Sequence, residues 1–189
     1  IEMRSTENGS IKIDMPDDGS TGRAQILNES TVVYPNTGLG VDTIVTVPSD
    51  NTVETYHLIR SAESPKRYPY KTTTEGKELY QVDDRTVMIL GQDGLPEMSI
   101  SAPKATDAEG REVPLKLTIE DNQVVLYVEH DDSFTYPVVA DPKYRGQEIN
   151  DAEWKFCMQP GNWGLCYAVL DILQSQAANK ANQLSNEKG

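Results

Sequence analysis

Apolar and polar side chains alternate over short stretches from residue 10 to about residue 140, and turn residues separate these stretches. Such period-two alternation is the pattern of a half-buried β-strand. It is clearest at 113–120 and 123–129, which carry aliphatic side chains at every second position. Asp121 and Asn122 between them tolerate the positive φ of a tight turn. The pattern predicts a β-hairpin with one apolar face.

Weaker alternation predicts further strands on both sides of this hairpin. They are expected at 11–15, 23–27, 31–34, 42–47, 53–60, 78–82, 85–90, 97–101 and 134–140. Many short strands with frequent Gly, Pro, Asn and Asp between them are typical of antiparallel architectures. We therefore expect a mainly β fold, an antiparallel β-sandwich or barrel-like domain at residues 10–142. Residues 1–9 are expected to be a flexible N-terminus.

The pattern changes near residue 145. We expect a linker at 143–150 and a helical tail at 151–189, in which apolar side chains recur at steps of three or four. These side chains are Cys166, Leu170, Leu173, Ala177, Ala181 and Leu184. Pro160-Gly161 predicts a turn and Asn162 a helix N-cap, so that a short helix before the turn pairs with the helix after it. The expected tail is a C-terminal αα-hairpin.

Two cysteines, Cys157 and Cys166, flank this turn. An extracellular chain most often joins two nearby cysteines, whereas two buried thiols are typical of a cytosolic chain. We expect a disulfide that clips the αα-hairpin. Apolar side chains around it are candidates for an interface, and they are Trp154, Phe156, Trp163, Tyr167, Leu170 and Leu173. They bind a partner, for example a second copy in a homodimer through the tail, or they seal one end of the β domain.

Charge narrows the classes of partner. The 189 residues hold 17 Lys and Arg against 30 Asp and Glu, a net charge of −13. This balance argues against nucleic-acid binding, which requires cations that neutralise phosphates, and against docking on anionic lipid. No apolar run approaches the roughly 20 residues of a membrane span. We expect neither nucleic acid nor a membrane span among the interactions of this chain.

Little in the sequence points to catalysis. His57 and His130 lack a Gly-x-Ser-x-Gly element or a Cys-His signature beside them. The acidic pairs at 17–18, 83–84 and 131–132 lack the alternating ligands and later Glu of a calcium loop. We expect no metal, no cofactor and no enzymatic activity, although carboxylate-based enzymes leave little trace in a sequence.

One local cluster combines bases with aromatic side chains on this acidic chain. It comprises Lys66, Arg67, Tyr68, Tyr70 and Lys71. Tyrosines beside Lys and Arg contact acidic polymers or sugars, and binding sites often lie on loops. We interpret the segment as a loop and its residues as ligand-binding candidates. The alternative is an ordinary exposed connection between strands.

The segment Thr135-Tyr-Pro-Val-Val-Ala-Asp-Pro142 resembles the motif that ends a β domain in many secreted proteins of Gram-positive bacteria, especially actinobacteria. Upstream elements at 31–37, 42–47 and 108–114 are also similar to that family. The resemblance covers about 110 residues, and only the seven-residue motif from Tyr136 is specific. It implies a secreted protein with a β domain and a variable C-terminal segment, often helical with a cysteine pair. It supplies no catalytic residue.

Three functional hypotheses follow. The leading one is a secreted, non-enzymatic binding protein of the cell envelope or the medium, whose partner is a protein or an envelope polymer. The first alternative is a precursor, in which the β domain escorts a C-terminal bacteriocin-like peptide. Cleavage within 141–147 would release that peptide, because Lys143 and Arg145 suit trypsin-like proteases. The second alternative is an enzyme of unrecognised type.

Overall fold

The computed structural model describes residues 2–5, 9–49, 52–73, 76–92, 94 and 96–146. Every paired strand in this part of the chain is antiparallel, so the prediction of a mainly β, antiparallel fold is confirmed. The predicted αα-hairpin, the Cys157–Cys166 disulfide and the tail interface lie outside the described residues. Within the described residues, no helix could span a membrane.

A five-stranded sheet forms one half of the β domain. Its order is β1 (Glu2–Ser5), β2 (Gly9–Asp14), β7 (Arg67–Thr73), β13 (Gln123–Val128) and β12 (Leu115–Glu120). The predicted hairpin is its β12–β13 pair, in register from Leu115 opposite Val128 to Glu120 opposite Gln123. Asp121 and Asn122 adopt φ values of 48° and 60°. These values confirm the tight turn, which needs positive φ at both positions.

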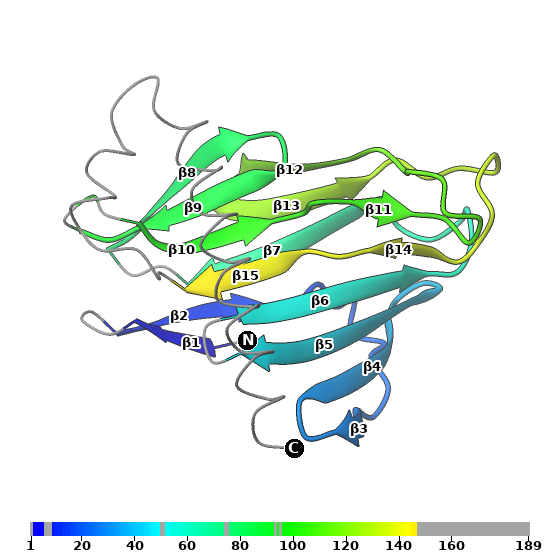
Figure 1. Cartoon of the computed structure of the whole chain (residues 1–189), viewed down its shortest axis with the longest axis horizontal. Helices are drawn as coiled ribbons and strands as arrows, with labels where there is room; N and C mark the ends of the chain where they lie inside the picture. The colour runs from blue at the N-terminus through cyan, green and yellow to red at the C-terminus, as the bar shows by residue number, and fades with distance from the viewer. Residues whose placement is uncertain are drawn as a thin grey trace, which may run out of the picture. The chain divides into compact units, whose positions relative to one another are not determined.

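A ten-stranded sheet forms the other half (Figure 1). Its main order is β3 (Gln25–Asn28), β4 (Thr31–Gly38), β5 (Val41–Ser49), β6 (Thr52–Ile59), β15 (Lys143–Gly146), β10 (Pro96–Ser101), β9 (Thr86–Leu90) and β8 (Glu78–Asp83). Beside this path, β14 (Val138–Ala140) pairs with β6 and with β11 (Ala105–Thr106). β14 and β15 pair with two successive stretches of β6, and Asp141-Pro142 separates the two strands in the sequence.

The core lies between the apolar faces of the two sheets. Both sheets supply its large, fully buried side chains, among them Ile11, Ile13, Ile59, Tyr70, Ile89, Ile100, Leu117, Leu126 and Tyr144. Each buried aliphatic or aromatic side chain of this size stabilises the fold by about 1.5–3 kcal/mol relative to its exposed state. Tyr136, Val138 and Ala140 of the motif also face this core, as their alternation predicts.

Three predictions for local structure are wrong. Residues 1–9 include β1 and the start of β2, not only a flexible end. Residues 143–146 form β15 between β6 and β10, where a linker was expected. From Arg67 onward, the basic and aromatic segment is strand β7 and not a loop. The sequence does not indicate β15 because this strand is too short to show alternation. It does not indicate β7 because a proline such as Pro69 is unusual inside a strand.

The position of Pro69 explains why β7 accepts it. On one side Pro69 lies opposite Val125 of β13. On the other side, β2 pairs with β7 only from Lys71 to Thr73. Pro69 therefore lies beyond the end of the β2 ladder, at a local sheet edge where a missing N–H costs no hydrogen bond.

In the part of the chain that the structure describes, hydrogen bonds close one end of the ten-stranded sheet against the other sheet. At the β8–β9 end, the Leu117 N–H of β12 donates to the Asp84 carbonyl at 2.7 Å. The Gln81 side-chain amide donates to the Leu117 carbonyl at 3.0 Å. β3 lies at the opposite end, away from β12 (Figure 1). The described domain is thus closed along one side and ends in an edge strand along the other.

Candidate functional site

Strand β7 divides the predicted ligand residues between two faces. Tyr68 and Tyr70 are buried and point into the core, whereas Arg67 and Lys71 are exposed on the outer face. The exposed Lys66 immediately precedes the strand. The predicted cluster is therefore not one surface, because alternation along a strand separates neighbouring side chains. Only its basic members reach solvent.

The outer face of the five-stranded sheet joins Arg67 to side chains that the sequence did not indicate. Tyr127 lies opposite Arg67 in one ladder and opposite Lys116 in the next. The Lys116 Nζ lies 5.1 Å from the centre of the Tyr127 ring, a cation–π arrangement. The Arg67 Nε donates to the Tyr127 Oη at 3.3 Å. We name Lys116, Tyr127 and Arg67 the cation–tyrosine row.

Glu120 fixes the geometry of this row. Its Oε2 accepts from the Arg67 Nη2 at 3.0 Å, and its Oε1 accepts from the Tyr127 Oη at 2.8 Å. Hydrogen bonds from Tyr127 and then Arg67 lower the pKa of the Glu120 carboxyl. Hydrogen bonding to Glu120 raises the pKa of the Arg67 guanidinium. Glu120 and Arg67 are therefore both charged at neutral pH, and they orient the tyrosine between two cations.

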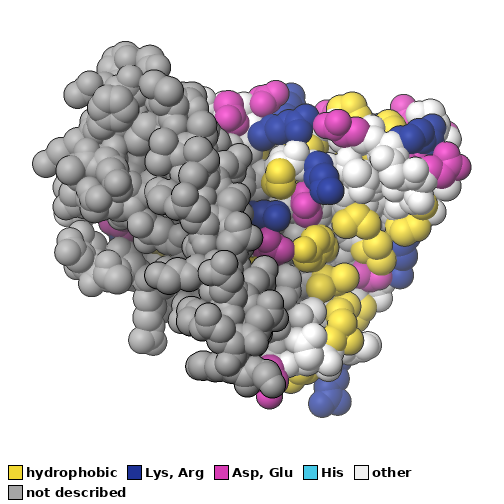
Figure 2. Space-filling view, in the orientation of Figure 1, with side chains coloured by type: hydrophobic (Ala, Val, Ile, Leu, Met, Phe, Trp, Pro, Cys, Tyr) yellow, Lys and Arg dark blue, Asp and Glu magenta, His cyan; other side chains and the backbone are white. Residues whose placement is uncertain are grey.

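Cations outnumber anions among the described side chains of this outer face. Beyond the row it carries Lys12 and Lys71, and its two acids are Asp14 and Glu120. Lys12 and Asp14 form an exposed ion pair at 3.6 Å. The opposite face of the molecule differs: Figure 2 shows hydrophobic, acidic and basic side chains intermixed there. The five-stranded sheet thus offers a locally basic surface with an aromatic ring on an acidic chain.

His57 is enclosed in a chain of buried hydroxyl groups. Its Nδ1 shares a hydrogen bond with the Thr43 Oγ1 at 3.0 Å, and Thr43 in turn contacts the Thr37 Oγ1 at 2.8 Å. Its Nε2 is hydrogen-bonded to the Tyr70 hydroxyl. Burial lowers the pKa of His57 to about 4. The imidazole is neutral at physiological pH and has no nitrogen left for a substrate, which argues for a structural role.

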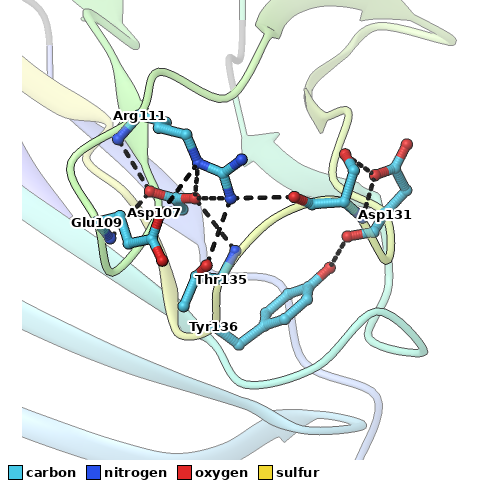
Figure 3. Close-up of polar contacts among 7 residues, drawn as sticks. Asp107, Glu109, Arg111, Asp131, Thr135 and Tyr136 are labelled. Carbon is cyan, nitrogen blue, oxygen red and sulfur yellow. Dashed lines mark hydrogen bonds and ion pairs between the residues drawn. The ribbon is translucent and has the colours of Figure 1, made fainter.

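His130 is likewise engaged with the protein. Its Nε2 donates to the Pro65 carbonyl at 3.1 Å, and its Nδ1 lies 2.9 Å from the Tyr136 hydroxyl. The Tyr136 hydroxyl also lies 2.9 Å from the Asp131 carbonyl, to which it donates (Figure 3). These contacts hold the loop before β14 against the loop before β7. They account for the tyrosine at the head of the motif.

A buried carboxylate holds the same loop from its other side (Figure 3). The Asp107 side chain is fully buried and accepts from the N–H groups of Glu109, Arg111 and Thr135 at 2.9–3.1 Å. The Arg111 Nε donates to it at 2.8 Å, and the Arg111 Nη2 donates to the Ser133 carbonyl at 3.0 Å. Burial raises the pKa of Asp107, but these hydrogen bonds outweigh burial and lower it overall. Both carboxylate oxygens of Asp107 are thus used to hold these loops together.

The described residues contain no group of three or more His, Cys, Asp or Glu side chains that could hold a metal ion. No family model, curated protein or solved structure matches the chain. The cation–tyrosine row is therefore the candidate site on chemical grounds alone. Sequence reasoning found Arg67 and Lys71 but missed Lys116, Glu120 and Tyr127. The outward position of Lys116 between Leu115 and Leu117 was a readable signal, whereas its pairing partners were not.

Proposed function

We propose that the protein is a secreted, non-enzymatic binding protein that binds an anionic polymer of the cell envelope through the cation–tyrosine row. The observation that carries this proposal is the row itself, in which the half-buried Tyr127 lies between the exposed Lys116 and Arg67. Sugar rings stack on tyrosine, and phosphate or carboxylate groups pair with Lys and Arg. A polymer that bears both chemistries matches both parts of the row.

The overall negative charge of the chain limits where such a polymer can bind. A net charge of −13 repels an anionic ligand from most of the surface. At physiological salt, charges beyond about 8 Å are largely screened. Attraction is therefore local to the outer face of the five-stranded sheet. This predicts modest affinity, strong salt dependence and selectivity for ligands that contact the row directly.

Binding to purified cell-wall polymer that carries phosphate groups tests the proposal. We expect Lys116→Gln combined with Arg67→Gln to weaken binding roughly 5–30-fold, since each exposed charge contact contributes about 0.5–1 kcal/mol. Titrations at low and high salt measure the dissociation constants. Lys104→Gln is the matched control, because it removes an exposed lysine from the loop before β11. Equal losses in the double variant and in Lys104→Gln, or no binding by the unmodified chain, would contradict the proposal.

A second candidate function is the precursor of a C-terminal peptide. One observation favours it: contacts divide the chain into two units, residues 1–148 and 149–189. β15 occupies residues 143–146, so a releasing cleavage is expected after Gly146 and not at Lys143 or Arg145. Non-reducing intact mass spectrometry of the natively secreted protein distinguishes the two candidates. Fragments that end within 147–150 support a precursor, and a single full-length species supports the binding protein.

A further inference from the structure

Strand β3 forms an open edge of the ten-stranded sheet. Among the described residues it pairs only with β4, and all four of its residues are exposed. Ile26 is 79% exposed and Leu27 is 62% exposed. An edge strand presents unpaired N–H and C=O groups that can pair with another chain. Natural edges usually carry charges, proline or a β-bulge against such pairing. The centre of β3 is apolar, and its ladder with β4 shifts register between Ile26 and Asn28.

The apolar surface at this edge continues the core. Cross-strand register places Ile26 opposite Val32, and Val32 opposite Val45. Val45 packs against the buried core. Residues opposite one another share a face of the sheet. These three apolar side chains therefore lead outward from the core. Ile26, the last of them, has most of its side chain in water.

Charges beside β3 indicate which kind of strand fits. Arg23 precedes the strand, Glu29 follows it, and both are exposed. Neither has an ion-pair partner among the described residues. An antiparallel strand with the same sequence would bring its glutamate beside this arginine and its arginine beside this glutamate. The edge is complementary to itself in charge.

Symmetry limits the possible registers. When a two-fold axis relates two antiparallel strands, the alternation of close and wide hydrogen-bonded pairs requires one residue to lie opposite its own copy. The β3–β4 ladder shifts register between Ile26 and Asn28, and Glu29 lies in the turn that follows β3. With Ile26 at the axis, the turn that carries Glu29 in each copy comes beside the segment that carries Arg23 in the other. This register joins the apolar contact to both charge pairs.

We propose that a second copy of this chain pairs antiparallel with β3, centred on Ile26, so that two ten-stranded sheets continue into one another through a two-fold axis. Two Arg23–Glu29 ion pairs flank the apolar contact. This interface lies on another sheet from the cation–tyrosine row and does not depend on the proposed function. It also differs from a homodimer through the tail.

Four exposed residues make a small interface. Interfaces below about 1,200 Å² are typical of weak association. We therefore expect a dissociation constant of roughly 10 µM to 1 mM. Two copies with a net charge of −13 each also repel one another, which is screened at about 0.15 M salt.

Sedimentation equilibrium of the full chain tests the proposal, from low micromolar to about 1 mM protein. We expect a reversible monomer–dimer equilibrium that Ile26→Lys weakens at least about 10-fold, because the substitution places like charges at the axis. Leu39→Lys is the matched control. Leu39 is 67% exposed in the turn between β4 and β5, outside the edge. Unchanged thermal unfolding of both variants shows that each still folds.

A charge exchange tests the register. Arg23→Glu alone is expected to weaken dimerisation, and Arg23→Glu combined with Glu29→Arg is expected to restore it. A chain that stays monomeric at every concentration overturns the proposal. So does a dimer that tolerates Ile26→Lys as well as Leu39→Lys, which would place the contact elsewhere, for example in the tail. Failure of the double variant to recover would overturn the register centred on Ile26.

Discussion

His57 stays neutral in the folded chain because burial disfavours the charged imidazolium. Its two nitrogens contact Thr43 and Tyr70, and it has no exposed surface. Alternation along 53–60 puts His57 on the same strand face as Val53, Thr55 and Ile59, and all four are buried. What it could not supply was the buried hydroxyl from β7, on the other sheet. Alternation along a strand thus predicts which face a side chain such as His57 occupies. Its hydrogen-bond partners depend on tertiary packing and cannot be predicted from that alternation.

This burial makes stability depend on pH. Burial lowers the pKa of His57 to about 4 in the folded chain, against 6.5 ordinarily. Between these values the unfolded state binds a proton that the folded state does not, so stability is full above pH 6.5 and falls toward pH 4. The loss reaches about 3 kcal/mol.

Urea unfolding at pH 8, 6 and 5 measures this prediction. The matched variant is His57→Gln, which is less stable at pH 8 but lacks the titrating group. We expect the free energy of unfolding of the unmodified chain to fall more steeply than that of the variant between pH 6.5 and 5. Parallel slopes would assign the pH dependence to other groups.

At the scale of elements, β15 changes the view of the segment after the motif. The Asp141-Pro142 pair ends β14, but the chain resumes at once as β15. Tyr144 is fully buried, and Lys143 pairs with Glu54 at 3.0 Å. A single inward side chain in four residues gives no detectable period, which is why this strand was missed. β15 is held in the sheet by the buried Tyr144 side chain and by its pairing with β6 and β10.

Resistance to trypsin follows from this pairing. A protease binds an unpaired extended segment, so cleavage after Lys143 or Arg145 requires local opening of β15. We expect cleavage at these positions at least about 10-fold slower in the native chain than in urea-unfolded chain. Tyr144→Ala removes the buried anchor and is expected to accelerate cleavage after Lys143, because such a truncation destabilises by about 3–5 kcal/mol. Peptide mapping by mass spectrometry gives the rates. Equal rates in native and unfolded chain would show that β15 is open.

At the scale of the whole molecule, sequence reasoning recovers what is local. The β12–β13 hairpin was predicted because both strands and their turn are adjacent and each carries its own signal. β7 was missed although it alternates, since Pro69 and the basic residues Lys66, Arg67 and Lys71 in and just before it are typical of a loop. The cation–tyrosine row was missed in part because Arg67 and Tyr127 are 60 positions apart. No local sequence pattern predicts the contact between these two side chains.

The place of β15 in the sheet has a consequence for how the chain folds during synthesis. The strands from β3 to β6 and those from β8 to β10 can form as separate meanders, but β15 must enter between β6 and β10 to join them. The Thr55 hydroxyl donates to the Pro142 carbonyl across 87 positions of sequence. Contacts of such separation slow folding. The β3–β6 and β8–β10 half-sheets therefore stay separate until almost the last residue of the β domain has been synthesised. Until then the free edges of β6 and β10 can pair with the wrong strand.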